Sequence, residues 1–119
     1  MSDLLWQLGA IETAELISKK DVSTREVIKN HLERFTEVNP KINAITRSLN
    51  DEAMEMAVLA DEKIFRNEQI GPLHGVPVTI KDNVDITGQT SPNGVSKLKD
   101  NLAPANSPVV DNLLKAGAI

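Results

Sequence analysis

The sequence predicts an α/β fold whose first half is helical. Two observations carry this prediction. Residues 1–67 place apolar side chains at helical spacing, whereas residues 70–119 contain a β-branched apolar run, a long polar connection and a last helix. A strand that is followed by a helix and then by a second strand is the repeating unit of α/β sheets.

The second predicted helix has the clearest start. Ser23 and Glu26 have the spacing of a capping box, and Val22 and Val27 stand where a hydrophobic staple places them. We expect the helix to end at Asn39-Pro40, because proline disfavours helical geometry in the residue before it. Its apolar stripe would be formed by Val27, Ile28, Leu32 and Phe35.

Two further helices are expected in the first half. An earlier, weaker one runs through Ala14, Leu16 and Ile17, and a later one runs from about Asp51 to Phe65. The later helix would pack closely through small residues on its inner face, namely Ala53, Ala57, Ala60 and Ile64. We interpret all three apolar stripes as core packing.

The run Val76–Ile80 predicts a strand. It is nearly all apolar, as expected for a strand covered on both faces, and Val76, Val78 and Ile80 would share one face. Pro77 favours an early or edge position, because proline removes a ladder donor. Lys81 follows at the carboxyl end of this strand, where ligand sites lie in open α/β sheets.

The last helix is expected from Ser107 to Ala116. Ser107 is its N-cap and Pro108 its first residue, with Val110, Leu113 and Leu114 facing inward and Gly117 as the stop. Ala118-Ile119 would then begin a second parallel strand.

Composition excludes several function classes. Hydrophobic residues make up 40% of the 119 residues and aromatic residues 3%, so the core must be aliphatic. The net charge is −4 without a basic patch, which argues against direct nucleic-acid binding. The absence of cysteine excludes thiolate chemistry, and His31 and His74 lie in settings too different for a metal site. With no apolar run of membrane length and no secretory signal, we expect a soluble cytoplasmic protein that does not enter a membrane.

The string from Gly71 to Asn83, Gly-Pro-Leu-His-Gly-Val-Pro-Val-Thr-Ile-Lys-Asp-Asn, resembles the lysine-bearing motif of the amidase signature family. Residues Thr90–Gly94 resemble the polar loop that follows in that family, and Ser107–Ile119 resemble its next helix and strand entry. The resemblance implies an α/β fold with a mixed sheet flanked by helices, of which residues 1–119 would be the N-terminal part of a single domain.

The resemblance also implies a chemistry. Family members hydrolyse amides with a Ser–cis-Ser–Lys triad and without a cofactor or metal, and Lys81 matches the catalytic lysine. A neutral lysine takes a proton from the bridging serine, and desolvation favours the neutral amine. The substrate would be a small-molecule amide. Asp82 and Asn83 would orient the lysine loop.

The glycine- and serine-rich segment that supplies both serines and the oxyanion hole in the family has no match here. Ser91, Ser96 and Ser107 lie in a loop or at a helix start, without a glycine-rich turn. We therefore expect this chain to supply only the lysine and to be inactive alone. Two alternatives stay open: the glutaminase-type subunit of a tRNA-dependent amidotransferase, and a non-catalytic interaction fragment. A homo-oligomer is also open.

Overall fold

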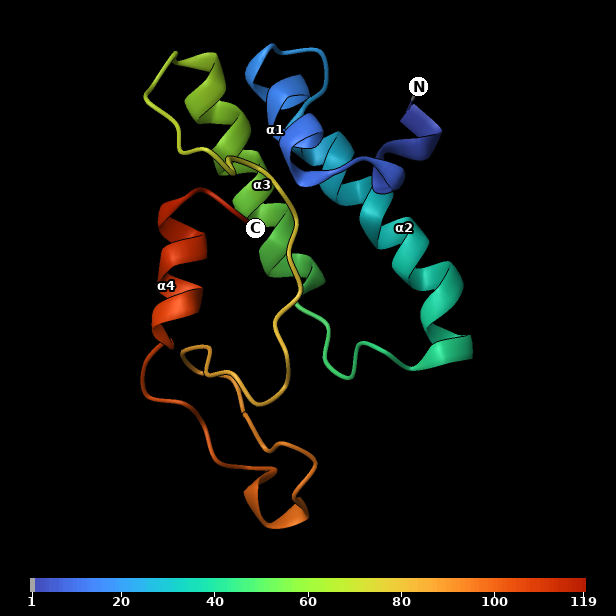
Figure 1. Cartoon of the computed structure of the whole chain (residues 1–119), viewed down its shortest axis with the longest axis vertical. Coiled ribbons are helices and arrows are strands. Elements are labelled where there is room, and N and C mark those ends of the chain that lie inside the picture. Colours follow the sequence, from blue (N-terminus) through green and yellow to red (C-terminus); the bar gives the residue numbers. More distant parts are fainter. Residues whose placement is uncertain (1) are drawn as a thin grey trace.

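The computed structural model describes residues 2–119, with side chains from residue 4 onward. Its helical elements, in chain order, are η1 (Ser2–Gln7), α1 (Ala10–Ser18), α2 (Thr24–Ile42), α3 (Asn50–Phe65), η2 (Ser96–Leu98) and α4 (Pro108–Lys115). Helix α2 packs against α3 and against η1, and α4 lies on the other side of α3 in Figure 1. A long connection leaves the upper end of α3, runs down across that helix, and extends below α3 and α4 before it enters α4 (Figure 1).

The start of α2 confirms the predicted capping box. The Ser23 hydroxyl accepts the backbone N–H of Glu26 at 3.1 Å, and the Glu26 carboxylate accepts the backbone N–H of Ser23 at 2.8 Å. Helix α3 adds a second cap, because its Asp61 carboxylate accepts the backbone N–H of Thr24 at 2.6 Å. These carboxylates complement the positive end of the helix dipole.

The predicted end of α2 is wrong. Pro40 lies inside the helix, which continues to Ile42. Asn43 then adopts a left-handed conformation, with φ 47°, and its N–H donates to the Asn39 carbonyl at 2.7 Å. The Asn39 side chain also holds Ile45, accepting its N–H at 2.9 Å and donating to its carbonyl at 3.0 Å. Near a helix end proline removes a single backbone bond, and these contacts stabilise the helix end beyond it.

The core lies where η1, α1, α2 and α3 meet. Leu5, Ile17 and Val27 form a buried cluster, and the partly buried side chains around it are Leu8, Val22 and Ile64. Val22 thus packs beside Val27, as the predicted staple requires. The inner face predicted for α3 is confirmed at its centre, because Ala57 and Ala60 are both buried.

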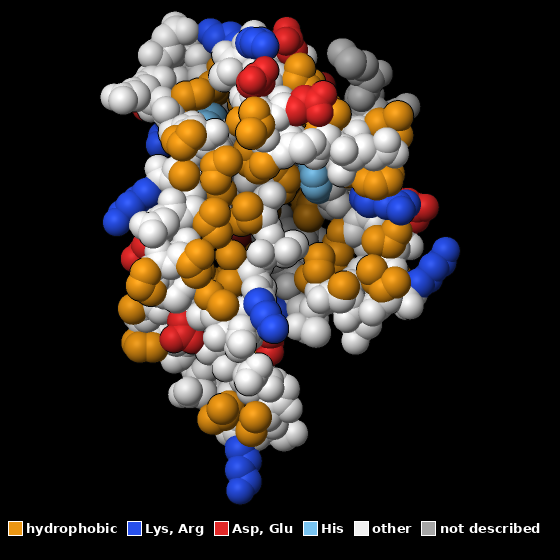
Figure 2. All heavy atoms as spheres, viewed as in Figure 1, with side chains coloured by type: hydrophobic (Ala, Val, Ile, Leu, Met, Phe, Trp, Pro, Cys, Tyr) orange, Lys and Arg blue, Asp and Glu red, His pale blue; other side chains and the backbone are white. Residues whose placement is uncertain are grey.

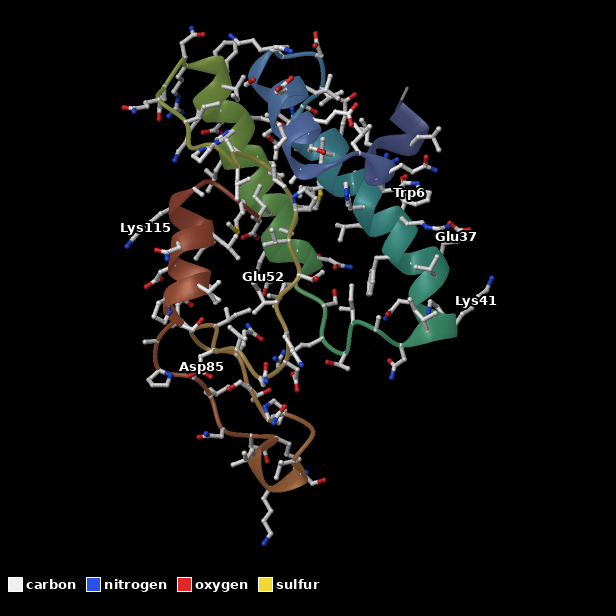
Figure 3. The ribbon with its side chains drawn as sticks, in the orientation of Figure 1. Trp6, Glu37, Lys41, Glu52, Asp85 and Lys115 are labelled. Carbon is white, nitrogen blue, oxygen red and sulfur yellow. The ribbon has the colours of Figure 1, made fainter. Side chains whose placement is uncertain are left out.

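Two contacts fix η1 across α2. The Trp6 backbone N–H donates to the Asn30 side chain at 2.9 Å, and the Arg34 guanidinium lies 4.3 Å from the centre of the Trp6 ring. Figure 3 shows Trp6 against the outer side of α2. A cation over an indole face is a favourable electrostatic pair.

Helix α4 begins with Pro108 after Ser107, as predicted. At its other end Gly117, with φ 94°, donates to the Leu114 carbonyl, and Ala118 donates to the Leu113 carbonyl, both at 3.0 Å. This pair of bonds is the Schellman motif that glycine favours. Val110 is buried, but the predicted inward position of Leu114 is wrong, because that side chain is 45% exposed.

The predicted strand Val76–Ile80 is an extended segment, and no strand forms among residues 2–119. It nevertheless lies beside the last residues of the chain. The Ile119 N–H donates to the Val76 carbonyl at 2.9 Å, and the Val78 N–H donates to the Ile119 carbonyl at 2.7 Å. Two residues that flank one in this way have the bonding pattern of a parallel β pair. The segment differs from the predicted strand because no further strand neighbours it in the described residues.

The molecule exposes more surface than a compact monomer of its mass. Its accessible area is 8063 Å², whereas about 6,300 Å² is expected for 13 kDa. Its radius of gyration is 15.0 Å, against roughly 13.5 Å expected. Figure 2 shows apolar side chains spread over one whole face, and several large ones are more than half exposed: Leu4, Ile11, Ile42, Leu59, Phe65, Leu102 and Val109.

Within residues 2–119, no helix is both long enough and apolar enough to cross a membrane.

Candidate active site

The segment that leads to Lys81 is anchored at its start and open at its end. His74, Gly75 and Val76 are buried, whereas Val78 is 37% exposed and Thr79 is exposed. The prediction that both faces of this segment are covered is therefore wrong for residues 78–79 in this chain. The backbone bonds to the chain end are likewise concentrated at the start of the segment, where Gly75 bonds to Gly117 and both Val76 and Val78 bond to Ile119.

The anchor is built by His74 and Gly75. The His74 Nε2 lies 3.0 Å from the Ala60 carbonyl of α3, so this nitrogen carries the hydrogen and donates it. Gly75 has φ 77°, and a Cβ there would lie 2.7 Å from the Thr24 hydroxyl. Only glycine fits this close approach to α2 in a left-handed conformation. The start of the lysine motif is thus fixed against two helices.

Lys81 lies at the end of this segment and is exposed. Its carbonyl accepts the N–H of Val84 at 2.9 Å, which makes a tight turn through Asp82 and Asn83. Lys81 is therefore open to solvent, at the end of a segment that is buried only at its start. Both predicted orienting residues lie in the turn itself, directly after the lysine.

Sequence reasoning missed Arg47, which reaches this turn from the connection between α2 and α3. Its guanidinium contacts the Thr90 hydroxyl, the Thr90 carbonyl and the Asp82 carboxylate, the last with an N–O distance of 3.4 Å. No sequence signal marks Arg47, because its partners lie 35 and 43 residues further along the chain.

The connection between Lys81 and α4 is held by its own contacts. Thr90 and Leu102 form an isolated antiparallel bridge, and the Thr87 N–H donates to the Asn106 side chain at 2.8 Å. The Asp85 carbonyl accepts the Ser107 N–H at 3.0 Å, which brings Asp85 to the start of α4 (Figure 3). The long predicted connection is therefore an ordered loop that returns close to its origin.

The serines of this region form no hydrogen bond with Lys81 among the described contacts. Ser91 donates to the Asp85 carboxylate, and Ser96 begins the short helix η2. The Ser107 hydroxyl is buried without a hydrogen-bond partner among the described residues. None of these contacts joins a serine to Lys81, so the described hydrogen bonds do not contain the serine–lysine pair that the resemblance implies.

The two histidines have separate structural partners. The His31 Nδ1 lies 2.9 Å from the Val27 carbonyl within α2, and the residue is half-buried. His74 bonds α3, as described above. No group of three or more His, Cys, Asp or Glu side chains that could hold a metal ion occurs in the part of the chain that the structure describes.

Comparison with known proteins identifies relatives over almost the whole chain. The model of a family described as Amidase matches residues 26–119. The chain is 45% identical over 115 residues to an indoleacetamide hydrolase from Bradyrhizobium diazoefficiens, covering 97% of this chain and 22% of that protein. It is 39% identical over 115 residues to a subunit of the glutamyl-tRNA(Gln) amidotransferase from Caldanaerobacter subterraneus, covering 97% and 23%.

Solved structures give the same result for the fold. A bacterial aryl acylamidase of the amidase signature enzymes superposes with a TM-score of 0.88 at 29% identity, over 94% of this chain and 24% of that one. A fatty acid amide hydrolase superposes with a TM-score of 0.93 at 24% identity, over 98% and 21%, and it bears on the fold alone. The chain thus spans between a fifth and a quarter of the length of the proteins it matches.

Proposed function

The chain belongs to the amidase family, and on that premise we propose that it supplies the lysine base to an enzyme that hydrolyses a carboxylic amide. The products would be a carboxylic acid and ammonia or an amine. The observation that carries this proposal is the position of Lys81. It ends an extended segment within the string Gly71–Asn83 that resembles the family's lysine motif, and the family match runs through this string.

The proposed chemistry needs a neutral Lys81. Its Nζ accepts a proton from a bridging serine, which in turn takes the proton of the nucleophilic serine as that oxygen attacks the amide carbon. The collapsing tetrahedral intermediate expels the amine, which leaves with a proton, and water then hydrolyses the acyl-serine. No metal or cofactor enters these steps.

Both serines would come from the part of an amidase that this chain does not span. The exposure of Lys81 supports this division of the site between segments. A lysine base must be neutral, because an ammonium has no lone pair to accept a proton. Coverage of the Lys81 turn by further protein would remove water and favour the neutral form.

A second candidate function is that of the glutaminase-type subunit of a tRNA-dependent amidotransferase. Its support is the 39% identity to a glutamyl-tRNA(Gln) amidotransferase protein, against 45% for the indoleacetamide hydrolase. Both functions release ammonia from an amide and use the same lysine. They differ in whether a partner protein takes up the ammonia, so amide hydrolysis that is strongly stimulated by partner subunits would favour this candidate.

The experiment that tests the lysine's role compares Lys81→Ala with Lys99→Ala in the full-length enzyme that contains this segment. Lys99 is an exposed lysine of the loop between η2 and α4, so it controls for the loss of one charge. A general base contributes about 10²–10⁴-fold to a rate. We expect kcat for a simple primary amide to fall by about 10³-fold with Lys81→Ala and to stay near normal with Lys99→Ala, with unchanged circular dichroism. A near-normal kcat for the Lys81 variant would refute the assignment.

A non-catalytic interaction fragment is the third interpretation of the sequence. It predicts that full-length protein containing this segment hydrolyses neither primary amides nor glutamine, with or without partner subunits. The same assay therefore decides between this interpretation and the two enzymatic ones.

A further inference from the structure

Arg47 joins three parts of the candidate site. It lies in the connection between α2 and α3, and its guanidinium donates to both the hydroxyl and the carbonyl of Thr90. The same group forms an ion pair with Asp82, the residue that follows Lys81. Arginine offers five N–H donors in a rigid planar fork, so one side chain can hold several acceptors in a fixed arrangement.

The base of the Arg47 side chain is itself held in place. Two residues earlier, the backbone N–H and carbonyl of Ile45 are both bonded by the Asn39 side chain of α2. Asn43 closes the end of α2 through its own N–H. The connection that carries Arg47 is therefore tied to α2, which packs on the core of the molecule.

The restraint from Arg47 is passed to Lys81 through the backbone. Asp82 follows Lys81 directly, and the Lys81 carbonyl closes the tight turn by accepting the Val84 N–H. We propose that Arg47 is a positioning residue, which sets the position of the Lys81 turn by holding Asp82 and Thr90 together. This inference rests on the proposed role of Lys81 as the base.

The effects of losing Arg47 on stability and on kcat should differ in size, and this difference distinguishes a positioning role from a purely structural one. The Arg47 and Asp82 side chains are 35% and 34% exposed, and ion pairs at such exposure contribute about 0–1 kcal/mol to stability. Folding therefore depends little on this pair. A catalytic group that is displaced by 1 Å can lose about 10²-fold in rate. Loss of Arg47 should consequently affect kcat far more than stability.

The test uses the full-length enzyme that contains this segment, with Arg47→Ala, Arg47→Lys and Lys81→Ala measured side by side. Arg66→Ala is the matched control, because Arg66 is also an arginine in ion pairs, with Glu62 and Glu68, but lies just after α3, at the far end from Arg47. We expect Arg47→Ala to lower kcat by about 10–100-fold, to leave KM within about threefold, and to keep the unfolding midpoint of the control. Arg47→Lys should recover little, because an ammonium lacks the planar fork.

Chemical rescue supplies a readout that a general loss of structure would not give. Guanidinium chloride at millimolar concentration, well below denaturing levels, should raise the kcat of Arg47→Ala at least severalfold and leave Arg47→Lys and Arg66→Ala unchanged. A double variant of Arg47→Ala with Asp82→Asn should lose no more activity than the more impaired single variant, because both changes remove the same restraint.

Three results would overturn the inference. A normal kcat for Arg47→Ala beside an inactive Lys81→Ala would remove the role of Arg47 and leave the proposed function intact. A raised KM with unchanged kcat would show that Arg47 contacts the substrate and does not position the lysine. Retained activity of Lys81→Ala would overturn the proposed function together with the positioning role that depends on it.

Discussion

The Asp61 carboxylate of α3 accepts the backbone N–H of Thr24, the first residue of α2, at 2.6 Å. Its second oxygen accepts a hydrogen bond from the side-chain Nε–H of Arg25 at 2.8 Å. A helix start leaves several N–H groups without partners inside the helix, and Asp61 satisfies two of them from a neighbouring helix, those of Thr24 and of Arg25, the latter at 3.3 Å. This contact fixes the start of α2 on α3, and both helices also hold the anchor of the lysine motif.

We expect Asp61→Ala to lower the free energy of unfolding by about 1–2 kcal/mol, because the N–H of the fully buried Thr24 would lose its acceptor without access to water. Urea unfolding followed by the helix signal measures the change. The control is Glu62→Ala, since Glu62 is exposed and pairs with Arg66 on the same helix surface. Equal midpoints for both variants would contradict the role of Asp61.

Glu26 should make the stability of α2 depend on pH. The backbone N–H and then the hydroxyl of Ser23 donate to its carboxylate and lower the pKa of Glu26 from its ordinary value of 4.5. A group whose pKa is lower in the folded state adds stability above its unfolded pKa and loses it as the pH falls through the folded value. We therefore expect Glu26→Gln to reduce stability at pH 7 and to lose less on acidification to pH 3 than the parent chain.

The matched control for this pH series is Glu55→Gln, on the exposed side of α3. It removes one carboxylate without touching the capping box. If the stability of both variants changed with pH from 7 to 3 as that of the parent chain does, Glu26 would make no specific contribution to the pH dependence of stability.

Gly117→Ala should destabilise the chain more than Gly94→Ala. Both glycines have positive φ, 94° and 73° respectively, so both substitutions add backbone strain of about 1 kcal/mol. A Cβ at Gly117 would also lie 2.8 Å from the His74 Cα, whereas no atom lies within 4 Å of a Cβ at Gly94. The difference in unfolding free energy between the two variants isolates the contact with His74. A larger loss of stability for Gly94→Ala than for Gly117→Ala would show that the close contact between Gly117 and His74 does not restrict the residue at position 117.

The isolated 119-residue chain should hydrolyse no amide above background. It carries Lys81, but no serine is hydrogen-bonded to Lys81 among the described contacts, and a base without its nucleophile and oxyanion hole does not catalyse acyl transfer. An ammonia-release assay with primary amides measures this. Turnover that is abolished by replacing one of Ser91, Ser96 or Ser107 with alanine would contradict the expectation.

The isolated chain should also self-associate and keep helix better than its extended segment. The excess accessible surface and the exposed apolar side chains favour association. Among residues 76–80 the amides of Thr79 and Ile80 should exchange within seconds to minutes and those of Val76 and Val78 should be partly protected, whereas those of α2 should exchange more slowly. Light scattering and amide hydrogen exchange test both points. A monodisperse monomer with slow exchange throughout residues 76–80 would contradict them.

The helices could be predicted from the sequence because their determinants are local. Ser23 and Glu26 are three residues apart, and the small residues Ala57 and Ala60 lie on one face of a single helix. The predicted stop at Pro40 was wrong because a side-chain contact, which the apolar pattern does not reveal, stabilises the helix end. The Asn39 side chain bonds six residues ahead to Ile45, and this contact stabilises a helix end beyond the proline.

The sheet and the site could be predicted only in part, because they depend on distant partners. The apolar pattern of Val76–Ile80 indicates a strand, but a strand requires neighbours that residues 2–119 supply only through Ile119. The family resemblance indicated Lys81 as the candidate base. The contacts of Arg47 with Asp82 and Thr90 could be recognised only in the folded structure. Side chains that act across such separations leave no periodic signal in the chain.

The parallel pairing of Val76 and Val78 with Ile119 has a consequence for the order of folding. It closes a loop of about 40 residues, and the closure costs entropy before any bond is formed. The helix starts at Ser23 and Ser107 close contacts within a few residues and can form within about a microsecond. The extended segment Val76–Ile80 should therefore pack last, after α3 has formed and the Ala60 carbonyl can accept the His74 hydrogen bond. In a chain that is still being synthesised, the Lys81 turn would thus acquire its position only after α4 has emerged.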